Sequence, residues 1–242
     1  AASFMRHGFL LARDYAAKRR AFGASLAELP LHAELLADLD AASAGATLLA
    51  FELLELLGRQ EGREIDDAGA ALLRLLTPIA KAVTGKQAVA VLSETLEAFG
   101  GAGYLEDTML PVLLRDAQVL PIWEGTTNVL SLDALLRADF VTGAAALRAR
   151  VAAAQARTSE PALRAATDTA ARAIERGIAW RAATGDERAL QAGARRLVLS
   201  LGYAFEIALL AELADASGNS GNDRTAARRA CLQLAARACF FV

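Results

Sequence analysis

Apolar residues recur at alternating spacings of three and four along most of the chain, which is the period of one face of an α-helix. The longest such run begins after Pro30, and its leucines continue at these intervals to Gly58. Alanine and leucine, which lose the least free energy on entering a helix, outnumber valine, isoleucine and threonine. No segment has room for the strands of a sheet. We therefore predict an all-α fold.

Glycine and proline mark the expected ends of the helices. We expect helices over residues 3–22, 31–58, 78–99, 110–119, 126–137, 145–157, 161–182, 186–216 and 223–241. Thr77 and Pro78 have the residue types of an N-cap and a first helical position, and Gly100 has that of a left-handed helix end. The predicted architecture is an up-and-down bundle over residues 1–140 with a basic helical extension over 141–242. No capping residue precedes the first helix, so we expect an N-terminally truncated bundle.

Several classes of protein are excluded by residues that the chain lacks. Its two histidines, His7 and His32, lie far from its two cysteines, Cys231 and Cys239, and we expect neither a metal site nor a Ser-His-Asp triad. Charged residues interrupt each apolar run before it reaches the ~20 residues of a bilayer crossing. The N-terminus has no pattern of a secretory signal. We expect a soluble, cytoplasmic protein that does not enter a membrane.

Charge is distributed unevenly along the sequence. Residues 1–144 hold 12 basic and 19 acidic side chains, whereas residues 145–242 hold 14 arginines and 9 acidic side chains. The extension is thus basic and the bundle acidic. A basic helical surface suits an anionic partner such as duplex DNA, but an ordinary solvated face can carry the same charge. Aromatic residues there are expected in the core or at interfaces rather than as a base-stacking platform: Trp180, Tyr203, Phe240 and Phe241.

Two short segments carry polar features between apolar helices. In the first, Gly100-Gly101-Ala102-Gly103-Tyr104, glycines allow backbone N–H groups to approach a phosphate closely, although the same residues also suit a helix end and tight turn. In the second, Trp123-Glu124-Gly125-Thr126, a carboxylate follows an aromatic residue. A partly dry pocket would raise the pKa of such a carboxyl and let it remove a carbon-bound proton. The alternative is an acid that only stabilises the start of a helix.

These two segments, together with Arg19-Arg20-Ala21-Phe22-Gly23 and Arg115-Asp116, strongly resemble the acyl-CoA dehydrogenase family in order and spacing through residues 1–139. The segment 76–81, Trp123, Asn128 and the arginine-rich tail look most like the alkylation-response branch of that family. The resemblance implies a flavoprotein of fatty acid metabolism. Some members of this branch bind duplex DNA through their basic C-terminal helices.

The resemblance implies an FAD cofactor and a homo-oligomer, either a dimer or a tetramer. Arg19 and Phe22 would reach the adenosine-diphosphate part of an FAD that a neighbouring subunit binds. Gly100 and Gly101 would offer main-chain donors to the pyrophosphate. The other implied cofactor contacts are Glu97, which stands where dehydrogenases commonly have glutamine, with Thr126 and Asn128 near the flavin. Pro30 also replaces a glutamine that is common in the family.

Glu124 aligns with the general base that takes the α-proton of an acyl-CoA while the β-hydrogen leaves as a hydride. We expect its carboxylate to be half-buried and to lie on the same flank as the glycine turn. The resemblance implies that this chain is the C-terminal part of a longer dehydrogenase and is inactive alone. Two alternatives stay open: a DNA-binding flavoprotein with weak or vestigial activity, and a scaffold whose helices mediate only oligomer contacts.

Overall fold

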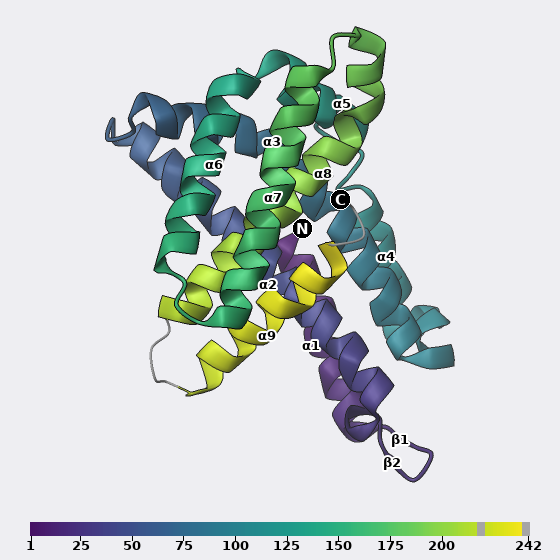
Figure 1. The fold of residues 1–242 in the computed structure, drawn as a ribbon. Helices are drawn as coiled ribbons and strands as arrows, with labels where there is room; N and C mark the ends of the chain where they lie inside the picture. The colour runs from purple at the N-terminus through teal and green to yellow at the C-terminus, as the bar shows by residue number, and fades with distance from the viewer. Residues whose placement is uncertain (217–220, 239–242) are drawn as a thin grey trace.

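The computed structural model describes residues 1–216 and 221–238, and within them nearly every residue belongs to a helix (Figure 1). The α-helices in this described part are α1 (Ala2–Lys18), α2 (Pro30–Glu61), α3 (Asp67–Ala98), α4 (Leu110–Gln118), α5 (Thr127–Leu132), α6 (Phe140–Arg157), α7 (Pro161–Ala183), α8 (Glu187–Ala216) and α9 (Gly221–Ala238). The predicted all-α fold is confirmed. Cys239, Phe240 and Phe241 lie outside the described residues.

The first helix ends earlier than expected, and a small hairpin follows it. Strand β1 (Arg20–Ala21) pairs antiparallel with β2 (Ala24–Ser25). The turn between them has φ of 52° at Phe22 and 86° at Gly23. Two successive left-handed residues make the tight turn that the twist of a hairpin requires. The prediction of a helix to residue 22 and of no strands is therefore wrong at this point, because strands of two residues leave no periodic signal.

The third helix begins ten residues before the expected N-cap. The side chain of Asp66 accepts a hydrogen bond from the backbone N–H of Gly69 at 2.8 Å and so caps α3. The helix then continues through Pro78. Proline inside a helix removes one backbone hydrogen bond, but Pro78 and Ile79 are buried in the core, and burial of this apolar face offsets the loss. The assignment of Thr77 and Pro78 to a helix start is wrong.

Helices α3 and α8 cross at the centre of the larger core. A Cβ atom on Gly202 of α8 would lie 2.4 Å from Cγ2 of Val83 in α3, so the two backbones approach closely because residue 202 has no side chain. Helices α6 and α7 pack beside α8, and α9 crosses α2 and α8 (Figure 1). Trp180 and Tyr203 pack against this core.

A smaller core lies between α1, α2 and α3, with Met5, Phe9 and Leu39 among its buried residues. The larger core contains residues from both sides of position 140, since α6 and α8 pack directly on α3. The division into a bundle and an extension at that position stays a prediction. Within the described residues, α2 and α8 are long and apolar enough to cross a membrane by length and composition, but most of the apolar stretch of α8 is buried among the other helices.

Candidate functional site

The β1–β2 hairpin and the glycine turn (Gly100–Tyr104) lie at the same end of the folded molecule. The rings of Tyr15 in α1 and Phe99 at the end of α3 stack with their centroids 4.2 Å apart. This contact joins the helix that leads to the hairpin to the helix that leads to the glycine turn (Figure 1). At the hairpin, the side chain of Phe22 is 95% exposed. Arg19 is also exposed, and its guanidinium has no hydrogen-bond or ion-pair partner within the described part of the chain.

The glycine turn offers an open surface to a ligand. Gly100 has a φ of 59°, as expected for a left-handed helix end. A Cβ atom on Gly100 or Gly101 would meet nothing within 4 Å. Gly103 differs, since its Cβ would lie 1.9 Å from the carbonyl oxygen of Leu96. The turn is therefore folded tightly onto the end of α3 through Gly103 and is open at Gly100 and Gly101.

These features fit part of a dinucleotide that approaches from outside the chain. An exposed ring can stack on a base, an unpaired guanidinium can bind a phosphate, and glycines without neighbours leave space for it. Glu97 is exposed on the last turn of α3 in the same region. An ionised carboxylate there would repel a pyrophosphate placed directly against it. The residues at this end thus fit the adenosine-diphosphate half of FAD, provided that the Glu97 side chain is turned away.

A second group of residues surrounds Glu124, on the loop between α4 and α5. Glu124 and Gly125 have φ of 54° and 107°. A positive φ is uncommon for a residue with a side chain and is kept only where the surrounding structure holds it. Here the loop is held against the middle of α3, because the ammonium of Lys81 donates hydrogen bonds to the carbonyl oxygens of Leu120 and Trp123, both at 2.8 Å.

Lys81 is a residue of this site that sequence reasoning did not single out. Burial lowers the pKa of its ammonium, and the nearby carboxylate of Glu124 partly opposes that shift. Its importance depends on contacts with residues about forty positions later in the chain, which periodicity does not reveal. A lysine among the apolar residues of a largely buried helix is the signal that the sequence offers.

Thr126 and Asn128 lie at the start of α5. Thr126 is the N-cap of this helix, and its hydroxyl accepts a hydrogen bond from the backbone N–H of Val129 at 3.4 Å. The side-chain oxygen of Asn128 accepts from the guanidinium of Arg195 in α8 at 3.3 Å. Both side chains are exposed. Asn128 thus links the start of α5 to a helix of the arginine-rich part of the chain.

The two groups are not side by side. The stretch of α3 from Lys81 to Ala98 rises by about 25 Å, and α4 carries the chain back along it from the glycine turn to the Glu124 loop. The side chain of Glu124 is exposed. The expectation of a half-buried carboxylate on the flank of the glycine turn is wrong for this chain. The physical reason is the return path of α4, which the spacing of the two motifs in the sequence does not disclose.

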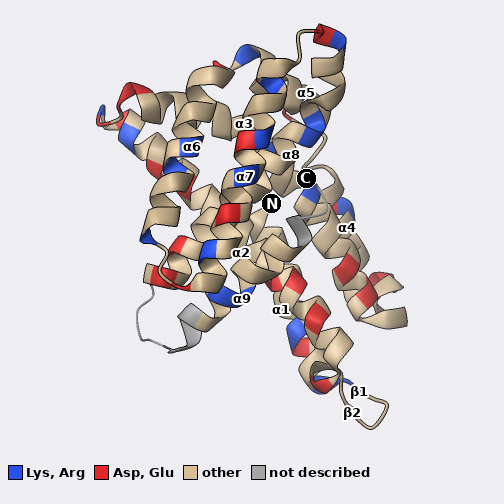
Figure 2. Cartoon of the chain, viewed as in Figure 1, with Lys and Arg blue, Asp and Glu red and all other residues tan. Residues whose placement is uncertain are grey.

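The arginines of the extension are mostly committed to contacts within the chain. Arg150 pairs with Glu52 at 2.8 Å and with Glu212 at 2.7 Å, and Arg157 also pairs with Glu212. Positive and negative side chains are interspersed on the helices rather than gathered in a single positive face in this view (Figure 2). Binding of duplex DNA by these helices stays a prediction. In the described ranges, no group of three or more His, Cys, Asp or Glu side chains is placed to hold a metal ion.

Comparison with known proteins identifies the first part of the chain. Residues 1–138 match the acyl-CoA dehydrogenase C-terminal domain. The chain is 54% identical over 132 residues to acyl-CoA dehydrogenase family member 11 of Caenorhabditis elegans, a match that covers 54% of this chain and 21% of that protein. It is 38% identical over 133 residues to the putative acyl-CoA dehydrogenase AidB of Escherichia coli, which covers 55% of this chain and 24% of that one.

A solved structure resembles nearly the whole chain. The crystal structure of Caenorhabditis elegans ACDH-11 in complex with C11-CoA superimposes with a TM-score of 0.86 and 38% sequence identity, covering 95% of this chain and 40% of that chain. The likeness therefore includes the helices after residue 138. This chain spans less than half of the length of each of these three proteins.

Proposed function

Because the chain belongs to the acyl-CoA dehydrogenase family, we propose that it is the C-terminal part of an FAD-dependent enzyme that removes two hydrogens from an acyl-CoA thioester. Glu124 is the general base of this reaction. The product carries a double bond between the α- and β-carbons. The observation that carries the proposal is the loop at Glu124, which the partly exposed ammonium of Lys81 holds in a left-handed conformation on α3.

The residues of this chain supply the proton chemistry. The carboxylate of Glu124 accepts the α-proton of the substrate. The backbone N–H of Glu124 has no hydrogen-bond partner within the described residues, so it is free to donate to the thioester oxygen and make that proton more acidic. The exposed indole of Trp123 lies beside it and would cover one side of the thioester. FAD, when bound, supplies the acceptor for the β-hydrogen, which leaves with both electrons of its bond.

Glu124 must lose its contact with water to act as an effective base, since desolvation brings the pKa of a carboxyl closer to neutrality. In this chain it is exposed, so other parts of the complete protein would cover it. Large apolar side chains exposed around the two groups support such cover: Phe22, Tyr104, Met109, Ile122 and Trp123.

The distance between the hairpin with its glycine turn and the Glu124 loop supports a homo-oligomer. A single bound FAD has its adenosine-diphosphate part at one end and its flavin at the other, and the two groups of residues are separated by about 25 Å of α3. We assign the hairpin and the glycine turn to the FAD of a neighbouring subunit, and Glu124, Thr126 and Asn128 to the FAD of their own subunit. The alkylation-response branch is supported by the likeness to AidB.

The substrate class is an acyl-CoA. The C11-CoA in the Caenorhabditis elegans structure, which this chain resembles along 95% of its length, supports this choice. The length of the acyl chain depends on walls that other parts of the complete protein supply.

The test uses the complete FAD-loaded protein. Loss of the visible flavin absorbance on addition of acyl-CoA is measured for the natural protein, for Glu124→Gln and for Glu55→Gln. Glu55 is an exposed carboxylate of α2 outside the site, so its variant is the matched control. We expect Glu124→Gln alone to abolish the bleaching while FAD content stays normal. Full bleaching by Glu124→Gln would remove Glu124 from its proposed role.

A further inference from the structure

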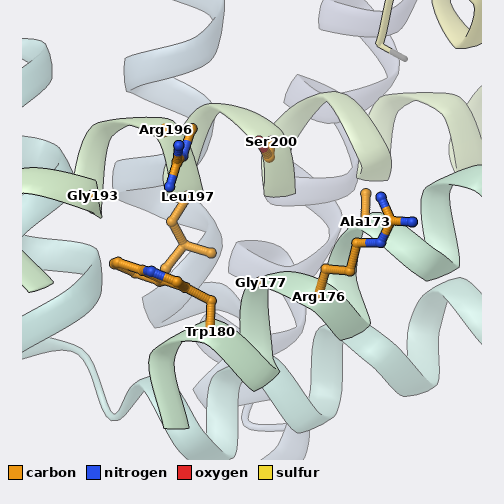
Figure 3. Close-up of a pocket in the computed structure, with 8 residues that line it drawn as sticks. All are labelled: Ala173, Arg176, Gly177, Trp180, Gly193, Arg196, Leu197 and Ser200. Atoms are coloured by element: carbon orange, nitrogen blue, oxygen red, sulfur yellow. The ribbon is translucent and has the colours of Figure 1, made fainter. Parts of the chain in front are cut away.

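A cavity of about 260 Å³ lies between α7 and α8, away from the residues discussed above (Figure 3). Arg176, Gly177 and Trp180 line it from α7, and Gly193, Arg196 and Ser200 line it from α8. Its volume is slightly below the roughly 300 Å³ at which the range of small-molecule sites in proteins begins. None of the residues assigned to FAD or to the acyl-CoA lines this cavity.

The polar groups of its wall are hydrogen-bond donors. They comprise two guanidinium groups, the indole N–H of Trp180 and the hydroxyl of Ser200, which can both donate and accept. No acidic residue lines the cavity. Within the part of the chain that the structure describes, none of these side chains has a hydrogen-bond or ion-pair partner. A wall of hydrogen-bond donors without acidic residues suits the binding of an anion.

Two arginines of the neighbouring helices α6 and α9 are paired with acidic residues. Arg148 lies 3.8 Å from Glu175, and Arg228 pairs with Glu160. Arg176 and Arg196, by contrast, both line the cavity, and neither has an ion-pair partner within the described residues. An anion bound between them would be attracted by both charges and could accept charge-assisted hydrogen bonds from both side chains.

The indole of Trp180 packs against Gly193 of α8. A Cβ atom on Gly193 would lie 2.3 Å from Cζ2 of Trp180, so the ring packs directly against the backbone of α8. Figure 3 shows the ring at one end of the cavity with Arg196 reaching toward it from α8. Arg176 of α7 lies at the opposite end, and Ser200 of α8 lies between the two arginines in this view. The packed ring of Trp180 offers a stacking surface, and the two guanidinium groups offer donors to phosphate oxygens.

We propose that this cavity binds a small anion of the nucleoside phosphate class. The planar base contacts the indole of Trp180, and the phosphate oxygens accept hydrogen bonds from Arg176, Arg196 and Ser200. The prediction that Trp180 is a core or interface residue is compatible with one side of its ring packing inward, since it is only partly exposed and also packs on the larger core.

The test is calorimetric titration of the complete protein, saturated with FAD so that its cofactor site is filled. ADP is the probe, and adenosine and inorganic pyrophosphate are titrated separately to divide the contribution of the base from that of the phosphates. We expect one ADP per chain, with adenosine and pyrophosphate each bound at least tenfold more weakly. Binding should weaken as salt is added, because the contacts are ionic.

Substitutions then locate the site. Arg176→Ala and Arg196→Ala should each weaken ADP binding at least tenfold, and Trp180→Phe should weaken adenosine more than pyrophosphate. Arg188→Ala is the matched control, since Arg188 is an exposed arginine of α8 that does not line this cavity. Both cavity arginines are exposed, so their variants should unfold at the temperature of the natural protein, which a melting curve verifies.

Two outcomes would overturn the proposal. One is the absence of ADP binding at millimolar concentration, and the other is ADP binding that neither arginine variant changes. A short DNA duplex is titrated in parallel. If the duplex binds through Arg176 and Arg196 and ADP does not, the cavity recognises the phosphates of a polymer and the assignment to a free nucleotide fails.

Discussion

The ammonium of Lys81 donates a hydrogen bond of 2.8 Å to the carbonyl oxygen of Trp123, the residue immediately before Glu124. The position of the proposed base is therefore set by a lysine in the middle of α3 rather than by the loop that carries the base. A second bond from the same ammonium to Leu120 fixes the other side of the bend. Two bonds from one donor restrict both the place and the direction of the peptide that leads to Glu124.

Replacement of Lys81 by methionine should disturb this arrangement. The carbonyl oxygens of Leu120 and Trp123 lose their donor, and only the bond to Leu120 is partly buried, so the expected cost to stability is about 1–3 kcal/mol for that one group. In the complete enzyme we expect kcat to fall at least tenfold while FAD content is unchanged. Lys86→Met, a change on the same helix at a lysine outside the site, should alter neither quantity. Equal kinetics in Lys81→Met and the natural protein would show that the loop holds its conformation without the lysine.

Gly103 should not tolerate even a methyl group. Its Cβ would lie 1.9 Å from the carbonyl oxygen of Leu96, and a clash with backbone cannot be relieved by a side-chain rotation. We expect Gly103→Ala to lower the free energy of unfolding by roughly 1–3 kcal/mol, as overpacked sites do. Gly101→Ala in the same turn meets nothing within 4 Å and should be nearly neutral. Thermal unfolding of the two variants separates these expectations.

Phe22→Ala tests the hairpin as part of a cofactor site. The ring is 95% exposed, so its removal should change the unfolding free energy by less than about 0.5 kcal/mol. In the oligomeric protein we expect at least tenfold weaker FAD binding, measured by fluorescence of the released flavin. Leu31→Ala removes another exposed apolar side chain, at the start of α2, and should leave the cofactor bound. Normal FAD affinity in Phe22→Ala would exclude the proposed contact with the neighbouring subunit's cofactor.

A buried acid in the larger core makes the stability depend on pH. Burial raises the pKa of Glu206 to about 8, and a hydrogen bond of 2.7 Å from the side-chain amide of Gln87 partly opposes the shift. The folded protein thus keeps a proton that the unfolded chain releases above its ordinary pKa of 4.5. Stability from this group is fully present below pH 4.5 and is lost as the pH rises toward 8, with a slope of about 1.4 kcal/mol per pH unit.

Glu206→Gln should remove that slope, because glutamine does not titrate. We expect the variant to be more stable than the natural protein at pH 8 and to differ least from it near pH 4.5. Urea unfolding at several pH values provides the measurement. An unchanged slope between pH 5 and 8 in Glu206→Gln would assign the pH dependence to other groups.

Sequence periodicity was sufficient to predict the helices but not all of their ends or the connections between them. Gly100 was recognised as a left-handed helix end because glycine in that position follows from local sterics alone. Pro78 was misread, since its tolerance inside α3 depends on the burial of its neighbours by distant helices. The hairpin at Phe22 and Gly23 was missed because a pair of two-residue strands carries no period.

The candidate residues were predicted as a set, whereas their arrangement was not. Motif order proposes Arg19, Gly100 and Glu124 as site residues, which stays a prediction, but nothing local shows that α4 returns the chain along α3 and separates Glu124 from the glycine turn. The bond between Asn128 and Arg195 joins residues of different helices far apart in the sequence. Such contacts are set by packing, so only a three-dimensional structure reveals them.

The distance between the hairpin and the Glu124 loop has a genetic consequence if each FAD is shared between subunits as proposed. A protomer with a defective hairpin and an intact Glu124 weakens FAD binding in its neighbour's catalytic centre. The catalytic centre that holds its own Glu124 depends on the neighbour's hairpin. Mixing Phe22→Ala protomers with Glu124→Gln protomers would then create, in each mixed pair, one centre with both lesions and one with neither. The hybrids would then be more active than either parent measured at a concentration of FAD that does not saturate Phe22→Ala.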